Sequence, residues 1–320
     1  MRMLVVDDDT VMLALLQEII RATTSYDVLT AGSSEEALDI INSVPADYFD
    51  CFLLDIQMPG MNGVDLCRTL RKSGLFPFTP IVMLTAMHEK RDVDAAFSAG
   101  ATDYITKPFE IHEIKIRLDH AQRRVAQLEA ARASDDGLHA VPNYGLFDFV
   151  PIFDVDGVVD YAAMENYLPS LPKQSRNGSV ILGVQIRSVE ALHAEATGLQ
   201  FSGLIEDTAE ALSDALHGYA CLISYAGNGT FLVVIESGHV PNRGLLADQV
   251  NLALQKQGTH LTMNRDTQIR VICGEFVRLT HFETGSIRGY MQDAQDSALR
   301  AATEVERNLE KFWFMGQVAH

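Results

Sequence analysis

The sequence predicts an α/β chain: a doubly wound parallel five-stranded sheet, a helical connector, and then an α+β domain with an antiparallel central sheet. Three observations lead to this prediction. A length of 320 residues is enough for two domains, each with a core of its own. Over residues 3–110, short apolar runs alternate with amphipathic stretches, as strands alternate with helices in parallel sheets. Residues 224–234 read SYAGNGTFLVV, which predicts a tight antiparallel hairpin.

The composition narrows the classes of partner. A formal net charge of −18 and a pI of about 4.8 predict repulsion of phosphate backbones and anionic lipid, so we expect neither nucleic acid nor membrane as a partner. No apolar run reaches the length of a membrane span. The opening MRMLVVDDDTVM is unlike a secretory signal, and the four cysteines form no Cys-x-x-Cys pair. We expect a cytoplasmic protein.

The first 110 residues supply five strands and four helices. The expected strands are 3–6, 27–31, 51–55, 80–85 and 103–106, and the expected helices are 11–22, 33–43, 63–74 and 90–100. Ser33 or Ser34 is placed to cap the second helix, and Gly74 and Gly100 are placed to end the third and fourth. Strands and helices in alternation give a parallel sheet covered on both faces.

Polar residues gather where these strands end. Asp7 and Asp8 follow the first strand, Asp55 ends the third, Thr85 ends the fourth, and Lys107 follows the fifth. Ligands of such sheets bind at the carboxyl ends of the strands. Three carboxylates beside one lysine and one hydroxyl form an oxygen-rich site suited to Mg²⁺.

Four segments in order, LVVDDD, LLDIQMPGMNG, MLTA and DYITKPF, resemble the receiver domain of bacterial response regulators. The resemblance covers about residues 1–120 and implies the flavodoxin-like fold. It implies that Asp55 is the phosphoacceptor, and that Asp7, Asp8, Asp55 and the main-chain carbonyl of Gln57 hold Mg²⁺. A sensor histidine kinase or a phosphotransfer protein would supply the phosphoryl group.

The same resemblance assigns the groups that respond to phosphorylation. Thr85 and Lys107 would each bind a phosphoryl oxygen, and Tyr104 would be the aromatic switch. Lys107–Pro108 falls where the family usually has a cis peptide bond. A carboxylate is a weak nucleophile toward phosphorus, so a cation has to neutralise charge between it and the incoming group.

Residues 111–134 predict a connecting helix. Its apolar positions recur at spacings of three and four: Ile111, Ile114, Leu118, Ala121, Val125 and Leu128. The first turns have to pack on the receiver sheet. The remainder is either one long surface helix or a short parallel coiled coil between two copies, and we favour the homodimer.

The segment PIFDVDGVVDYA, residues 151–162, allows two interpretations. It resembles the Asp-x-Asp-x-Val motif of haloacid-dehalogenase-like hydrolases, with Asp154 as nucleophile and Asp156 as general acid. No later strand ends in the paired aspartates that this family needs for Mg²⁺. An Asp-Gly hairpin needs only local turn chemistry, and we prefer it.

Beyond residue 179 the element order is β-α-α-β-β-α-β-α-β, which predicts an antiparallel sheet with helices on one face. Phe312 to Phe314 would form a last strand. This order, the place of the hairpin and the DAQDSALRAATE helix resemble the GGDEF domain of diguanylate cyclases. The resemblance covers about residues 150–315, and we expect the domain to span residues 140–320.

The residues that give a GGDEF domain its chemistry are missing from that alignment. The motif positions are occupied by Gly227, Asn228, Gly229, Thr230 and Phe231. Gln185 and Arg187 stand where the family has metal-binding aspartates, and Gly218 to Cys221 replace its inhibitory Arg-x-x-Asp. Two-metal phosphoryl transfer needs carboxylates. We therefore expect a degenerate, non-catalytic GGDEF-like domain whose Asn228-Gly229 turn remains.

Together these features predict a response regulator that is not an enzyme and signals through protein contact with an unidentified target. Two alternatives stay open. The second domain could be an active diguanylate cyclase with atypical ligands, or a module that binds GTP or cyclic di-GMP without turnover.

Overall fold

The computed structural model describes residues 1–86, 90–133, 144–148, 150–152, 155–171, 176, 178–236, 239–257, 269–279 and 287–318. The chain divides into two compact units, Met1–Leu138 and His139–His320. Each is described by itself. No helix in the described part of the chain is long and apolar enough to cross a membrane.

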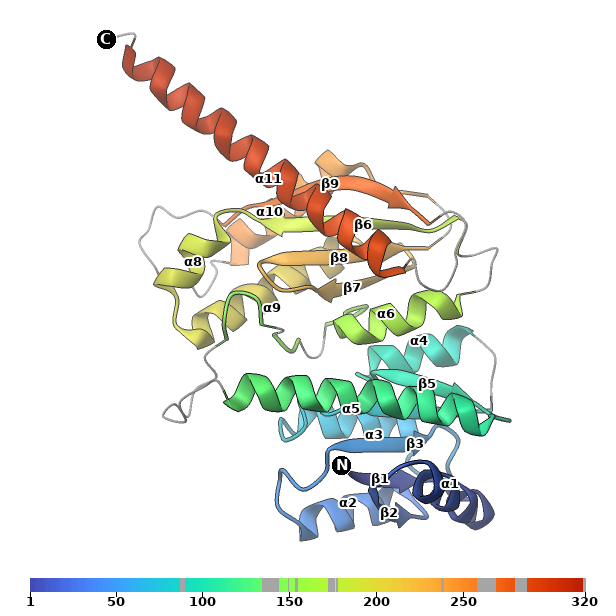
Figure 1. Cartoon of the computed structure of the whole chain (residues 1–320). Coiled ribbons are helices and arrows are strands. Elements are labelled where there is room, and N and C mark those ends of the chain that lie inside the picture. The colour runs from blue at the N-terminus through green and yellow to red at the C-terminus, as the bar shows by residue number, and fades with distance from the viewer. Residues whose placement is uncertain are drawn as a thin grey trace. The chain divides into compact units, whose positions relative to one another are not determined.

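The first unit is built on a parallel sheet of five strands in the order β2-β1-β3-β4-β5 (Figure 1). The strands are β1 (Arg2–Val6), β2 (Asp27–Ala31), β3 (Cys51–Asp55), β4 (Ile81–Thr85) and β5 (Asp103–Thr106). The helices are α1 (Thr10–Thr23), α2 (Ser34–Ser43), α3 (Gly63–Lys72), α4 (Lys90–Ser98) and α5 (Ile111–Ala133). This is the predicted doubly wound fold, and Ser33 caps α2 by accepting a hydrogen bond from the Glu36 amide.

Both faces of this sheet are covered, which explains its nearly unbroken apolar strands. On one face α1 and α5 pack against the sheet through Leu16, Ile20, Ile114 and Leu118. On the other face α2, α3 and α4 contribute a second cluster that includes Leu66. Of the apolar seam predicted for α5, Ile114, Leu118 and Ala121 are thus buried in this core, whereas Ile111 is 56% exposed.

The second unit contains an antiparallel sheet of four strands in the order β7-β8-β6-β9. The strands are β6 (Val180–Ile186), β7 (Cys221–Tyr225), β8 (Thr230–Ile235) and β9 (Val271–Arg278). The helices are α6 (Tyr161–Ser170), α8 (Val189–Glu195), α9 (Gly198–Ala215), α10 (Arg243–Gln257) and α11 (Ile287–Val318). Helix α6 was not predicted from the sequence; Asp160 caps its start by accepting a hydrogen bond from the Ala162 amide.

Helices cover both faces of this second sheet, so the prediction of one covered face is wrong. Helices α9 and α10 share a core with Leu182 and Val184 of β6. Helix α11 crosses the other face (Figure 1), where a Cβ added at Gly183 would lie 2.1 Å from the Ala294 carbonyl oxygen. All seven residues of β6 are buried, as two covered faces require.

Two further local predictions are wrong. Phe312 to Phe314 form no strand, because α11 runs through them to Val318. No turn signal separates them from the preceding helical sequence, so the helix continues.

The described residues of the 151–162 segment, 151–152 and 155–162, also do not form the preferred hairpin. Val158 instead makes a parallel bridge to Ile223 of β7, and the next residues begin α6. Within the rival hydrolase motif, Asp156 lies in the turn before this bridge, and Asp154 falls outside the described residues.

Candidate functional site

The carboxyl edge of the parallel sheet brings three aspartates and one lysine together. Carboxylate oxygens of Asp7, Asp8 and Asp55 lie within 4.8 Å of one another. The Lys107 Nζ donates hydrogen bonds to Asp7 Oδ2 and Asp55 Oδ1, both at 2.7 Å. Asp7 and Asp55 are buried, whereas Asp8 is exposed. The cluster is therefore a deep anionic site with one cation and an open side.

Local chain geometry fixes this arrangement. Strand β1 ends at Val6, and Asp9 caps α1 by accepting a hydrogen bond from the Val11 amide at 2.8 Å. The two acidic residues between them are thereby held at the sheet edge. The loop after β3 folds back so closely that a Cβ on Gly63 would lie 2.0 Å from the Asp55 carbonyl oxygen. Gly63 lies within the LLDIQMPGMNG segment but was not among the predicted site residues.

The pKa values of the site follow from burial and charge. Burial raises the pKa of the Asp55 carboxyl, while its hydrogen bond to Lys107 opposes the shift. Burial also disfavours charge on Lys107, but the hydrogen bonds to Asp55 and Asp7 outweigh it, so the pKa of Lys107 is raised. Lys107 consequently stays cationic at neutral pH.

Other residues predicted for this site occupy neighbouring positions. Thr85 is buried at the end of β4, and its carbonyl oxygen accepts a hydrogen bond from the Lys107 amide at 2.6 Å. Tyr104 lies on β5 with its ring edge-on to Phe97 at 6.0 Å. The Gln57 amide donates to the Asp55 carboxylate, and the Lys107–Pro108 bond is cis.

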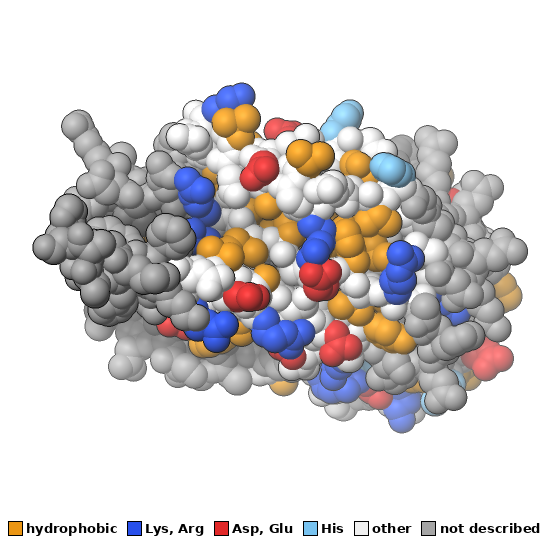
Figure 2. Space-filling view, turned by 90° about the horizontal axis from the view of Figure 1, so that it is seen from above, with side chains coloured by type: hydrophobic (Ala, Val, Ile, Leu, Met, Phe, Trp, Pro, Cys, Tyr) orange, Lys and Arg blue, Asp and Glu red, His pale blue; other side chains and the backbone are white. Residues whose placement is uncertain are grey.

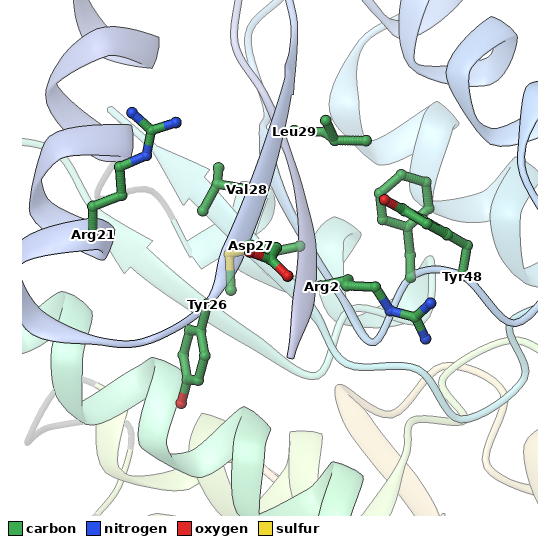
Figure 3. A pocket seen from close by; sticks show the side chains of 9 residues that line it. Arg2, Arg21, Tyr26, Asp27, Val28, Leu29 and Tyr48 are labelled. Atoms are coloured by element: carbon green, nitrogen blue, oxygen red, sulfur yellow. The ribbon is translucent and has the colours of Figure 1, made fainter.

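A cavity of about 250 Å³ lies near the opposite edge of the sheet, beside the starts of β1 and β2. Figure 3 shows Arg21 and Arg2 on opposite sides of these strands, so the two cations do not converge. The Arg2 guanidinium already stacks on the Tyr48 ring at 4.7 Å and pairs with Asp50 at 3.7 Å. The cavity therefore has no part in the acidic site.

Comparison with family models matches residues 3–119 to the response regulator receiver domain. Residues 3–119 form a receiver domain. The acidic cluster lies inside this match, as do Thr85, Tyr104 and Lys107.

The curated relatives match less than half of this chain. The DNA-binding response regulator MtrA of Mycolicibacterium paratuberculosis is 40% identical over 124 residues, which are 38% of this chain and 52% of MtrA. The transcriptional regulatory protein CpxR of Escherichia coli K12 is 35% identical over 136 residues, 42% of this chain and 55% of CpxR. The chain thus spans about half the length of these relatives.

Among solved structures, a probable two-component system response regulator/GGDEF domain protein is 25% identical, with a TM-score of 0.37. That match covers 39% of this chain and 50% of the other. It identifies no output domain here.

The second unit has its own cluster of predicted positions, around the β7–β8 hairpin. Gln185 of β6 pairs in register with Thr230 of β8, and both side chains are buried, at 2% and 6% exposure. The Thr230 hydroxyl donates to Gln185 Oε1 at 2.5 Å. Gln185 Nε2 donates to the carbonyl oxygens of Asn228 at 2.8 Å and Ile186 at 3.1 Å. A neutral, hydrogen-bonded pair therefore fills these positions.

The turn itself has the geometry that Asn-Gly predicts. Asn228 and Gly229 have φ values of 50° and 65°, and the Thr230 amide donates to the Gly227 carbonyl at 2.9 Å. Positive φ at both central residues and this bond are the features of a type I′ turn. A Cβ on Gly229 would lie 2.6 Å from Val189 Cγ2, so the site is closed to larger residues. Phe231 is buried beneath the turn.

Arg187 continues from β6 beside this pair. Its amide donates to the Arg270 carbonyl oxygen at 2.8 Å, and its buried Nε has no hydrogen-bond partner among the residues that the structure describes. Within the described residues, the Asp7, Asp8 and Asp55 group is the one cluster of acidic, His or Cys side chains with spacing suited to a metal.

Proposed function

We propose that the chain is a cytoplasmic two-component response regulator whose Asp55 accepts a phosphoryl group from a sensor histidine kinase or phosphotransfer protein. The observation that carries this proposal is the Asp55 carboxylate beside two further carboxylates and 2.7 Å from Lys107 Nζ. In the transfer, an Asp55 oxygen forms the new bond to phosphorus while the bond from phosphorus to the donor's imidazole nitrogen breaks.

The residues of the site fit this chemistry. Asp7, Asp8, Asp55 and the Gln57 carbonyl would hold Mg²⁺, which offsets the repulsion between carboxylate and phosphoryl oxygens when it is bound. Lys107 supplies a positive charge on a partly buried side chain, 18% exposed. Thr85 and Tyr104 are the groups we assign to sensing the added negative charge.

We infer further that the second unit is a degenerate GGDEF-like output domain without catalytic activity, acting by contact with another protein. The support is the Gln185–Thr230 pair. Neither side chain has a carboxylate, and the Gln185 amide is already hydrogen-bonded to Thr230 and to the Asn228 carbonyl. Arg187 beside it adds a positive charge that opposes metal binding. The connecting helix would join two copies through its seam.

We do not extend to this chain the DNA binding that the name of MtrA records. The net charge of −18 opposes a phosphate backbone. On the face drawn in Figure 2, basic and acidic side chains are interspersed among apolar ones, and the described residues there form no continuous basic surface.

An assay for cyclic di-GMP distinguishes a non-catalytic second unit from a diguanylate cyclase. Purified protein is incubated with GTP and Mg²⁺, before and after acetyl phosphate treatment, and cyclic di-GMP is measured. We expect none in either state. Cyclic di-GMP production that is lost on mutating the hairpin would instead establish a cyclase. Calorimetry with GTP and with cyclic di-GMP tests the binding module, and heat from either ligand would favour that alternative.

A further inference from the structure

Residues 144–148, which we call the strap, lie on the tip of the β7–β8 hairpin. The Asn228 amide, at the turn's central position, donates to the Leu146 carbonyl oxygen at 2.7 Å. A Cβ on Gly227 would lie 2.8 Å from the Phe147 carbonyl oxygen. The strap backbone therefore occupies the outer side of the turn, where a hairpin amide ordinarily faces water.

A second anchor holds the strap to a different element. The His193 Nε2 on α8 lies 2.8 Å from the Tyr144 carbonyl oxygen. A carbonyl has no proton to give, so Nε2 carries the hydrogen and donates. The His193 ring also stands edge-on to Phe201 at 4.7 Å, which fixes its direction. The Tyr144 and Leu146 side chains are partly buried against the core of this unit.

The strap also holds its own shape. The Gly145 amide donates to Asp148 Oδ2 at 2.7 Å, and the Asp148 amide donates to the Gly145 carbonyl at 3.0 Å. A turn closed by its own hydrogen bonds moves as one piece. At the hairpin tip, the Asn228–Leu146 hydrogen bond and the close approach of Gly227 to Phe147 are made by backbone atoms. Contacts of this kind can open locally while the sheet stays folded.

We propose that the strap is the conformational device through which the second unit receives its input. Docked, it closes the hairpin tip; undocked, it frees the Asn228 amide, the Gly227 face of the turn and the Leu146 side chain. Contact with the strap would give the Asn228-Gly229 turn a role that needs no carboxylate. This inference rests on the proposed function in one respect, since phosphorylation of Asp55 is taken as the input that releases the strap.

The docking is tested by hydrogen–deuterium exchange resolved to single amides. Gly227→Ala places a methyl against the Phe147 carbonyl and should speed exchange at Asn228 about tenfold or more. Gly218→Ala is the matched control, because Gly218 also has a positive φ, of 92°, but a Cβ there meets nothing within 4 Å. The control should leave the Asn228 amide within about twofold of wild type.

His193→Phe supplies an independent release that leaves the turn sequence intact. It keeps an aromatic ring beside Phe201 but removes the donor to Tyr144. The strap amides and the Asn228 amide should exchange faster together. Faster exchange in the strap with an unchanged Asn228 amide would show that the two do not form one unit, and would overturn the proposal.

The input step is tested by repeating the exchange after acetyl phosphate and Mg²⁺ treatment, with intact mass as the record of phosphorylation. We expect faster exchange at the strap and at Asn228, and no change in Asp55→Ala. A phosphorylated protein with unchanged exchange would overturn the strap's role and leave the proposed function standing. A protein that gains no mass would refute the proposed function, and with it the role of the strap as its receiver of input.

Discussion

At the scale of single residues, the two units stabilise their buried polar side chains differently. Asp55 is a buried carboxylate whose charge is balanced by Lys107, so it keeps reactive oxygens near the sheet edge. Gln185 is equally buried, but its amide is saturated by neutral partners. Burial of a charge needs a counter-charge, whereas burial of an amide needs only hydrogen bonds. The first arrangement is suited to chemistry and the second to packing.

Gln185→Glu should destabilise the second unit by about 1–3 kcal/mol at neutral pH, because a buried carboxylate can still accept from the Thr230 hydroxyl but cannot donate to the two carbonyl oxygens that Gln185 Nε2 contacts. Chemical denaturation measures the loss. Gln249→Glu on the exposed side of α10 is the matched control, since it adds the same charge at a solvated position. Equal stability of the two variants would contradict the account of the buried pair.

Asp103 predicts a pH effect on the receiver domain. Burial raises the pKa of its carboxyl to about 6, although Arg117 at 3.1 Å opposes the shift. The folded chain thus holds this proton more tightly than the unfolded chain does, so the contribution of Asp103 to the unfolding free energy falls as pH rises from about 4 to about 6. Asp103→Asn lacks this ionisation. The unfolding free energy of Asp103→Asn, relative to that of wild type, should therefore rise by on the order of 2 kcal/mol between pH 4 and pH 7. A difference that stays constant across this range would show that the carboxyl titrates normally.

At the scale of elements, sequence patterns predicted well where the signals were local. Each receiver strand is an apolar run that ends at or beside a polar residue, and Asn228-Gly229 defines the hairpin turn by itself. Prediction failed where the partner was distant. The Asp156-Gly157 turn precedes a bridge to β7, and only the folded chain brings Val158 beside Ile223. The aromatic run at Phe312 fits a strand or a helix equally, and the helix before it decides the outcome.

Helix α5 carries the prediction of self-association. The receiver core uses its apolar positions from Ile114 to Ala121, and Val125 and Leu128 continue the pattern beyond them. Val125→Lys with Leu128→Lys would place charges in that apolar stripe and should halve the mass measured by light scattering. Ala126→Lys, at an exposed position outside the seam, should leave the mass unchanged. The same mass for wild type and double variant would refute the coiled coil.

At the scale of the whole molecule, the two units differ in how much the sequence reveals. The residues of the acidic site in the first unit were recognisable from the sequence, whereas the role of the second unit was not. The acidic cluster was predictable because the carboxyl ends of parallel strands share one edge. The strap and the Gln185–Thr230 pair were not, because each depends on contacts between segments far apart in the chain. We interpret the receiver domain as the input and the second unit as a protein-contact output.

The most direct test of this account is the site of phosphorylation. Wild type, Asp55→Ala and Asp8→Ala proteins are incubated with acetyl phosphate and Mg²⁺, and intact mass and peptide mapping locate the label. We expect one phosphoryl group on Asp55 in wild type, none in Asp55→Ala with its fold intact, and weaker Mg²⁺ binding with slower labelling in Asp8→Ala. A phosphoryl group retained in folded Asp55→Ala, or absent from wild type, would contradict the central claim.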